Sequence, residues 1–444
     1  MGDAVAGGIV RRIYANLGRL LTGKAAAGLI SLAYMVIAAR VLGPSDYGVL
    51  ILVHGFVITV GGIIGFPGWH AVVRYGARHN AAGDVAGLAK LLRFVALVES
   101  LAGLAAILVA ACLAPILGPH LGWSPAALAW ALPYSFTILA SVRSTAAGYL
   151  QLMGRFDLLG VHNAIAPTAR LIGAGIIWWL DAGLSGFLAA WLAAALLEWI
   201  SLWMMAILVA RPALGGVPLS GPLHGVITEN PGIRRFMLIA NADITFGELA
   251  GRIGPLVIGW MLGAQAVGLY AIAQRATTVI AQPAQILGQA AYAELARLVA
   301  GGDHRLRLRR TVLHCTGIAM LAALPVIVIL ATFDREIAML IGGPAFAGAA
   351  GIMLWLTAAR MALLAAPPAG AALIALGRPG LSVTANLVGN LGLLPLLPLL
   401  LYGHGLPGAG WHAMLQAVVT AALLLGFVAR ATRGTPIRRQ EAVA

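Results

Sequence analysis

The chain has 444 residues, of which 61% are hydrophobic and only 10% are charged. A soluble protein of this length needs a charged surface, so the composition excludes one and predicts a membrane protein. The 29 Lys and Arg residues outnumber the 15 Asp and Glu residues, but they lie in short clusters between apolar segments, which is typical of cytoplasmic loops. We therefore expect no nucleic-acid partner.

Twelve apolar segments follow one another along the chain, each long enough to cross about 30 Å of hydrocarbon as a helix. Helix is required, because a strand or loop in lipid leaves its backbone groups unsatisfied. The segments are 20–42, 47–68, 94–117, 125–149, 158–180, 186–210, 236–262, 267–290, 311–333, 347–374, 382–402 and 409–430. The sequence thus predicts an all-α polytopic membrane protein with about twelve transmembrane helices.

The basic residues between these segments are divided unequally. Of the 29, 22 fall on one side of the membrane, five fall within apolar segments, and only Arg40 and Arg335 fall on the other side. Cytoplasmic loops carry the excess of Lys and Arg. We therefore expect a multi-pass inner-membrane protein with both termini in the cytoplasm.

The chain also repeats itself at about half its length. Three pairs of similar segments are separated by 219 to 223 residues: 42–49 with 262–269, 83–84 with 302–303, and 153–163 with 376–386. Six helices per repeat give both copies the same orientation, and such pairs of lobes enclose a central cavity. We predict an N-terminal lobe (1–210), a Pro-rich cytoplasmic linker (211–235) and a C-terminal lobe with a short basic tail (236–444).

The hairpin motifs of the two repeats carry a resemblance to a known family. They are ARVLGPSDYGVL (39–50), LGAQAVGLYAIAQR (262–275), and the turns Gly154-Arg155 and Gly377-Arg378. The chain resembles the polysaccharide-specific branch of the multidrug/oligosaccharidyl-lipid/polysaccharide (MOP) exporter superfamily, the O-antigen and exopolysaccharide flippases.

That resemblance implies a MATE-like pair of six-helix lobes that alternates between inward-open and outward-open states. It also implies a substrate, an undecaprenyl-pyrophosphate-linked oligosaccharide moved to the periplasmic leaflet for lipopolysaccharide or exopolysaccharide synthesis. Membrane lipids and polysaccharide assembly proteins are the partners it suggests.

Five arginines lie within the apolar segments, where each costs ~2.5–3.5 kcal/mol near the bilayer centre. We expect them to face the protein interior, where the planar guanidinium fork suits the paired oxygens of a diphosphate. The predicted substrate-binding residues are Arg143, Arg170, Arg252, Arg275 and Arg360.

Other roles for these arginines remain open. Glu248 and Arg252 are spaced i, i+4 on one helix face and could be a structural ion pair. Arg143 could lie close to a helix end and reach the interface.

Acidic and polar residues in the same segments are candidates for ion coupling. Desolvation favours protonation of a membrane carboxylate, so Asp243 and Glu248 are candidate H⁺ or Na⁺ sites, with charge balance for nearby arginines as the alternative. Glu99 and Glu198 are weaker candidates, for which a position near an interface is the alternative. His54 and Gln274 occupy matching positions in the two repeats and are candidate polar lining, although a lone membrane histidine is more often a packing residue.

Two other function classes fit parts of the sequence. A MATE-type drug or cation antiporter would share the lobes, but it prefers an acidic lumen, whereas here five intramembrane arginines meet four acids. A polytopic glycosyltransferase or O-antigen polymerase usually carries a sizeable external loop, and the external loops expected here are short. No Walker motif or metal-ligand cluster is present in the sequence. We therefore expect a transporter rather than an enzyme, with no cofactor and no metal.

Overall fold

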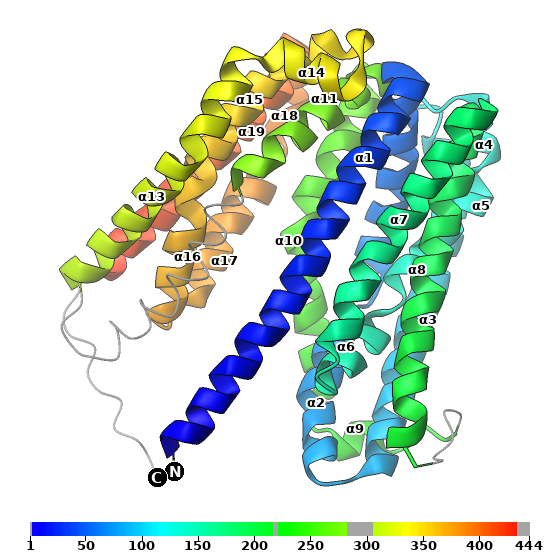
Figure 1. Cartoon of the computed structure of the whole chain (residues 1–444), viewed down its shortest axis with the longest axis vertical. Helices are drawn as coiled ribbons and strands as arrows, with labels where there is room; N and C mark the ends of the chain where they lie inside the picture. Colours follow the sequence, from blue (N-terminus) through cyan, green and yellow to red (C-terminus); the bar gives the residue numbers. More distant parts are fainter. Residues whose placement is uncertain (1, 216–220, 282–304, 433–444) are drawn as a thin grey trace. The chain divides into compact units, whose positions relative to one another are not determined.

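The computed structural model describes residues 2–215, 221–281 and 305–432 (Figure 1). Every element within these ranges is helical, and no strand occurs in them. This result confirms the predicted all-α class. By internal packing the chain divides into two compact units, Met1–Gly268 and Leu269–Ala444. The predicted lobe boundaries follow the sequence repeat instead, and they stay a prediction.

The first unit is built on long helices that pack through apolar residues. Its core joins α2, α3, α6, α8 and the start of α10, with Leu91, Leu150 and Leu202 fully buried. In chain order its elements are α1 (Gly2–Ile64), α2 (Trp69–Ala81), α3 (Val85–Leu117), α4 (Pro125–Ala129), α5 (Ala131–Ser135), η1 (Phe136–Ser141), α6 (Ser144–Leu152), α7 (Phe156–Leu180), α8 (Gly183–Ala213), α9 (Val226–Glu229) and α10 (Ile233–Leu262).

The second unit is a smaller bundle in which α13, α16 and α19 share a core around Leu308, Leu373 and Leu424. The boundary between the units falls within α11 (Ala264–Thr277). The following elements are η2 (Thr278–Ile280), α13 (Arg305–Thr332), α14 (Asp334–Gly342), η3 (Pro344–Ala349), α15 (Ala350–Ala362), η4 (Leu363–Ala365), α16 (Ala366–Ala375), α17 (Pro379–Asn386), η5 (Leu387–Gly392), α18 (Leu396–His404) and α19 (Leu406–Ala431).

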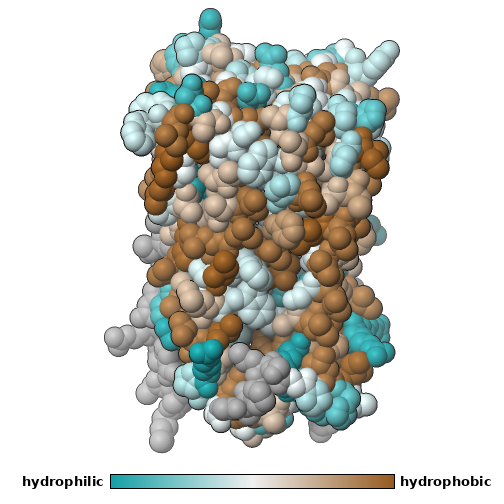
Figure 2. Space-filling view, turned by 90° about the vertical axis from the view of Figure 1, so that its right-hand side faces the viewer, coloured by the Kyte–Doolittle hydropathy of each residue, from teal (hydrophilic) through white to brown (hydrophobic). Residues whose placement is uncertain are grey.

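Six of the described helices are long and apolar enough to cross a membrane, and a bent pair formed by 379–392 and 396–404 would add a seventh. The first of them, Ala27–Ile64, covers most of the predicted segments 20–42 and 47–68, one on either side of a kink. Other predicted segments are built from shorter helices, such as α4 to α6. The second half of segment 267–290 lies outside the described residues. Figure 2 shows hydrophobic residues in a broad band across the middle of one face, with hydrophilic residues toward its ends.

The kink in α1 is the first sign of the internal repeat. Gly43 has φ 68° and ψ 177°, and its counterpart Gly263, between α10 and α11, has φ 81° and ψ 176°. Only glycine adopts this backbone conformation without strain. Four pairs of positive-φ glycines recur at separations of 220 to 223 residues: Gly43 with Gly263, Gly122 with Gly343, Gly154 with Gly377, and Gly183 with Gly405.

Repeat-related glycines also contact each other's helices inside the first unit. A Cβ added to Gly48 would lie 1.8 Å from the carbonyl oxygen of Ala264, and one added to Gly268 would lie 2.1 Å from that of Pro44. Because Gly48 and Pro44 are the counterparts of Gly268 and Ala264, the contact is reciprocal, as a pseudo-two-fold relation requires. Residues 302–303, in the remaining sequence pair, lie outside the described residues.

Candidate functional site

The predicted segment 125–149 is interrupted between Ser141 and Ser144, where η1 ends and α6 begins. The carboxylate of Glu99, on α3 and only 2% exposed, accepts hydrogen bonds from the backbone N–H groups of Ser144 and Thr145, the latter at 2.9 Å. It also accepts a 2.6 Å hydrogen bond from the Thr145 hydroxyl. A side chain of another helix thus satisfies the first N–H groups of α6, which a break in lipid would otherwise leave unpaired.

The other side of the break is held by two tryptophans of α8. The indole N–H groups of Trp199 and Trp203 donate to the Val142 carbonyl oxygen at 3.0 and 2.8 Å. With its carbonyl and N–H groups both partnered, the break is a defined feature of the fold rather than a frayed helix end. It fixes the position of Arg143, the residue before α6.

Arg143 lies in a polar network that reaches α7 and α8. Its guanidinium is 2.7 Å from the Glu198 carboxylate and 2.6 Å from Nε2 of His162, and its Nε donates to the Ala140 carbonyl. Because arginine can only donate, Nε2 of His162 must accept, which places the ring proton of a neutral His162 on Nδ1, toward Ser201. The Arg143 side chain is 30% exposed, so it is ion-paired but still accessible.

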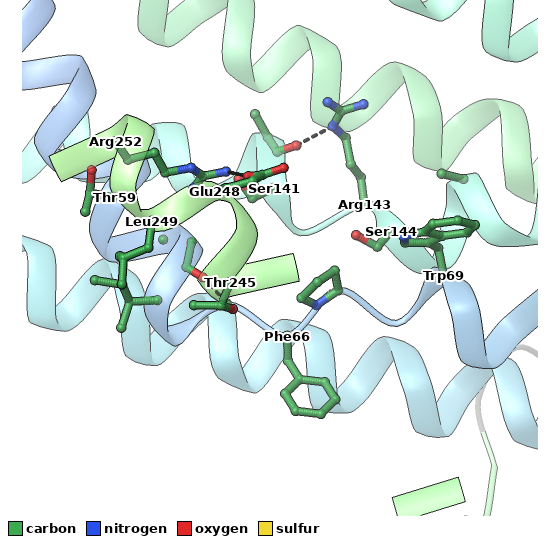
Figure 3. Close-up of a pocket in the computed structure, with 17 residues that line it drawn as sticks. Thr59, Phe66, Trp69, Ser141, Arg143, Ser144, Thr245, Glu248, Leu249 and Arg252 are labelled. Atoms are coloured by element: carbon green, nitrogen blue, oxygen red, sulfur yellow. Dashed lines mark hydrogen bonds and ion pairs between the residues drawn. The ribbon is translucent and has the colours of Figure 1, made fainter. Parts of the chain in front are cut away.

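Arg143 lines a pocket of about 390 Å³ together with Arg252 of α10 (Figure 3). The charged lining residues are these two arginines and Glu248, so the lining carries one net positive charge. The other lining residues are Thr59, Gly61, Gly62, Ile63, Gly65, Phe66, Pro67, Trp69, Ala140, Ser141, Ser144, Ala147, Thr245 and Leu249. We refer to this cavity as the arginine pocket.

Arg252 contacts its own helix, α10, and the neighbouring α1. It forms an ion pair with Glu248 one turn earlier, and it donates to the Ile58 carbonyl of α1 at 2.8 Å. A Cβ at Gly62 would lie 1.9 Å from Nη1 of Arg252, so the absence of a side chain there makes room for the guanidinium. The side chains of Arg252 and Glu248 are 29% and 55% exposed. The structural pair considered from the sequence therefore forms, and it forms at the pocket surface.

Arg170 has a different environment, packed among aromatic rings. Its guanidinium carbon lies 4.6 Å from the ring centroid of Trp191 and 5.8 Å from that of Tyr34, whose hydroxyl accepts from Nη1 at 3.2 Å. His54 contacts the same cluster edge-on to Trp191 and shares a 3.0 Å hydrogen bond with the Tyr134 hydroxyl. Trp191, Tyr34 and Tyr134 are buried. Neither Arg170 nor His54 lines the arginine pocket.

Three of the remaining predicted residues belong to the second unit. Arg275 and Gln274 are half-buried neighbours on α11, and Arg360 is half-buried near the end of α15. Asp243 lies on α10, but its side chain falls outside the described residues. Of the nine site predictions, the structure brings Arg143, Arg252 and Glu248 together.

Sequence reasoning missed several residues that shape this site. Glu198 and Glu99 are not among the predicted site residues, yet Glu198 pairs with Arg143 and Glu99 holds the helix break. Both lie in apolar segments, and an acid in such a segment needs a partner, so the sequence could have indicated that each has one. The pocket hydroxyls of Thr59, Ser141 and Thr245 gave no such signal, because small polar residues are common in membrane helices.

A model of the family described as polysaccharide biosynthesis protein matches residues 37–350, more than half of the chain. The chain belongs to this family. The matched range includes both hairpin motifs and the Gly154-Arg155 turn, so the resemblance to the polysaccharide branch of the MOP superfamily is confirmed. A curated relative, the inner membrane protein YghQ of Escherichia coli (strain K12), is 26% identical to this chain over 293 residues, 66% of this chain and 82% of that protein.

Several solved structures of MOP transporters share the fold of this chain. A multidrug resistance MATE family transporter in an inward-facing conformation matches with a TM-score of 0.74 at 15% identity, covering 91% of this chain and 94% of that one. The lipid II flippase MurJ, in an inward closed conformation, matches with a TM-score of 0.68 at 14% identity, covering 92% and 87%. A MOP superfamily transporter from Pyrococcus furiosus, reported to have a binding pocket of reverse polarity, matches with a TM-score of 0.60 at 15% identity. The match covers 95% of this chain and 96% of that one. The MATE-like fold predicted from the sequence is therefore confirmed, and the chain is a multi-pass membrane protein with a transporter fold.

Proposed function

We propose that this protein moves a polyprenyl-pyrophosphate-linked oligosaccharide from the cytoplasmic to the periplasmic leaflet of a bacterial inner membrane, by alternating access, for surface polysaccharide synthesis. Membership in a polysaccharide biosynthesis family supports the pathway. The fold that the chain shares with MOP transporters supports movement across the membrane rather than covalent chemistry. Both termini lie in the cytoplasm in this proposal, as the basic loops predict.

The observation that carries the proposal is the arginine pocket. Two arginines, whose side chains are each about 30% exposed, line one cavity together with Thr59, Ser141, Ser144 and Thr245. Guanidinium groups bind phosphate oxygens through short, charge-assisted pairs of hydrogen bonds. A volume of about 390 Å³ suits a diphosphate and its first sugar. The lipid tail would stay in the bilayer.

Glu248 gives the pocket an internal competitor for the substrate. Its carboxylate pairs with Arg252 and is more than half exposed, so an arriving diphosphate can displace it. In this proposal the Glu248 carboxylate re-forms the ion pair when the substrate leaves, or takes up a proton during the cycle. Of the two coupling candidates, Asp243 and Glu248, it is therefore Glu248 whose ion pair with Arg252 supports the role.

The test is complementation of a strain in which the gene has been deleted. Complete lipid-linked oligosaccharide should accumulate where a lectin added to spheroplasts cannot reach it, and the wild-type gene should restore lectin access. Arg143→Ala and Arg252→Ala should fail to restore it at equal protein level. Arg78→Ala is the matched control, because Arg78 is exposed on α2 and lines none of the site. Lectin access in the deletion strain equal to that of the wild type would overturn the proposal.

A further inference from the structure

A second cavity of the first unit lies between α3, α6 and α8 and has a different chemistry. It has a volume of about 410 Å³, within the ~300–1,000 Å³ of small-molecule sites. Its walls are mainly apolar, from residues such as Leu92, Ala96, Ala206 and Ile207. Its lining residue Leu97 is 43% exposed, so the cavity reaches the apolar outer surface of α3. A cavity on the surface of two membrane-spanning helices meets acyl chains rather than water.

Two polar groups distinguish this cavity from an ordinary groove. At one end, Arg93 lies close to Gly221, where an added Cβ would lie 1.9 Å from Nη1 of Arg93. Within the lining, Tyr149 is only 2% exposed and its hydroxyl has no hydrogen-bond partner in the part of the chain that is described. A buried hydroxyl without a partner is unfavourable and points to an absent polar group.

We propose that this cavity binds an anionic phospholipid of the cytoplasmic leaflet, with an acyl chain between α3 and α8 and its phosphate at Arg93. Lys90, one turn before Arg93, is paired with Glu229 at 2.6 Å, so Arg93 is the basic residue of the lining that would meet the phosphate. Basic residues on the cytoplasmic side attract anionic lipids. A sugar or a nucleotide would need several polar partners along its length. The walls offer few of these, because the Thr145 hydroxyl already donates to Glu99.

The lipid would be coupled to the arginine pocket through α6. This helix presents Ser144 and Ala147 to the arginine pocket, and Thr145 and Tyr149 to the lipid cavity. An acyl chain packed against the second face would stabilise the start of α6, and with it the position of Arg143. Lipid binding itself does not depend on which substrate the arginine pocket holds, so the site stands apart from the proposed function.

The experiment measures lipid retention and thermal unfolding of the purified full-length protein in detergent, with added phosphatidylglycerol or phosphatidylcholine. The wild type should keep one phosphatidylglycerol in native mass spectrometry and unfold at a higher temperature with this lipid than with phosphatidylcholine. Ala96→Trp fills the cavity and should remove both effects. Ala105→Trp is the matched control, because Ala105 lies on the exposed face of α3 outside the cavity.

Arg93→Gln tests the headgroup assignment and serves as the second variant if Ala96→Trp fails to fold. It should weaken phosphatidylglycerol binding about tenfold to a hundredfold, the effect of one lost charge-assisted hydrogen bond, and remove the preference over phosphatidylcholine. Arg78→Gln should change neither. Full phosphatidylglycerol retention by folded Ala96→Trp would overturn the site. An unchanged lipid preference in Arg93→Gln would overturn the anionic lipid.

Discussion

The first unit accommodates membrane arginines in two different ways. Arg170 is packed over the rings of Trp191 and Tyr34, with a tyrosine hydroxyl as its hydrogen-bond acceptor. Arg143 and Arg252 each pair with a carboxylate, and both line a cavity. The cost of placing an arginine in the membrane is therefore met by aromatic faces in one case and by acids in the other.

This difference shows that a charge in an apolar segment is a weak guide to binding by itself. A guanidinium group enclosed by aromatic rings contributes to the packing of the fold. A guanidinium group that is ion-paired at a pocket surface can instead release its carboxylate partner and bind an anionic ligand. We propose that Arg170 contributes to stability and that Arg143 and Arg252 bind the substrate. Four variants of the first unit would test this difference.

Replacing both pocket arginines should have the largest effect. The double variant Arg143→Ala/Arg252→Ala loses two charge-assisted contacts of ~1.5–3 kcal/mol each, so we expect flipping to fall at least a hundredfold. The measurement is the transfer of a fluorescent polyprenyl-diphosphate oligosaccharide in vesicles containing the purified protein. Arg143→Lys/Arg252→Lys should recover part of the rate, because charge is kept and only the planar fork is lost. Wild-type transfer by the alanine variant would refute the role of the pocket.

Arg170→Leu should lower stability and leave binding unchanged. It removes a desolvated cation–π interaction worth ~2 kcal/mol and the hydrogen bond to Tyr34. We expect a fall of several degrees in the unfolding temperature, with affinity for a polyprenyl diphosphate within twofold of the wild type. A large loss of affinity in a protein that unfolds at the normal temperature would reverse the comparison.

Glu99→Gln tests whether the helix break positions Arg143. The Glu99 carboxylate accepts hydrogen bonds from the backbone N–H groups of Ser144 and Thr145 through its two oxygens. A glutamine side chain has only one accepting oxygen, and its NH2 group would face one of these N–H donors. We expect the start of α6 to shift and diphosphate affinity to fall about tenfold, ~1.4 kcal/mol. Ser100→Ala, at the neighbouring exposed position of α3, is the control. Unchanged affinity in folded Glu99→Gln would show that the break does not control the pocket.

Glu248→Gln should give the smallest change, and in the opposite direction. Removing the carboxylate that competes for Arg252 should raise diphosphate affinity up to about fivefold, because partly exposed ion pairs contribute only ~0.2–1 kcal/mol. Binding titrations at low and high salt would measure the gain, which screening should reduce. Weaker binding in this variant would mean that Glu248 holds Arg252 in place rather than competing for it.

The sequence predicted the architecture better than the site. Hydropathy placed the helices, and the spacing of Gly43 and Gly263 revealed the repeat, because these features depend on local composition and backbone conformation. The partners of the arginines depend on which helices pack together. The i, i+4 pair of Glu248 and Arg252 could be anticipated, whereas the contact of Arg143 with Glu198 joins positions 55 residues apart in the sequence.

The most direct test of the arginine pocket is a calorimetric titration of the purified protein with farnesyl diphosphate, with farnesol as the uncharged control. We predict saturable binding of the diphosphate and none of farnesol. The double variant Arg143→Ala/Arg252→Ala should lose this binding, whereas Arg170→Leu should keep it. Equal binding of farnesyl diphosphate by the wild type and the double variant would contradict the account.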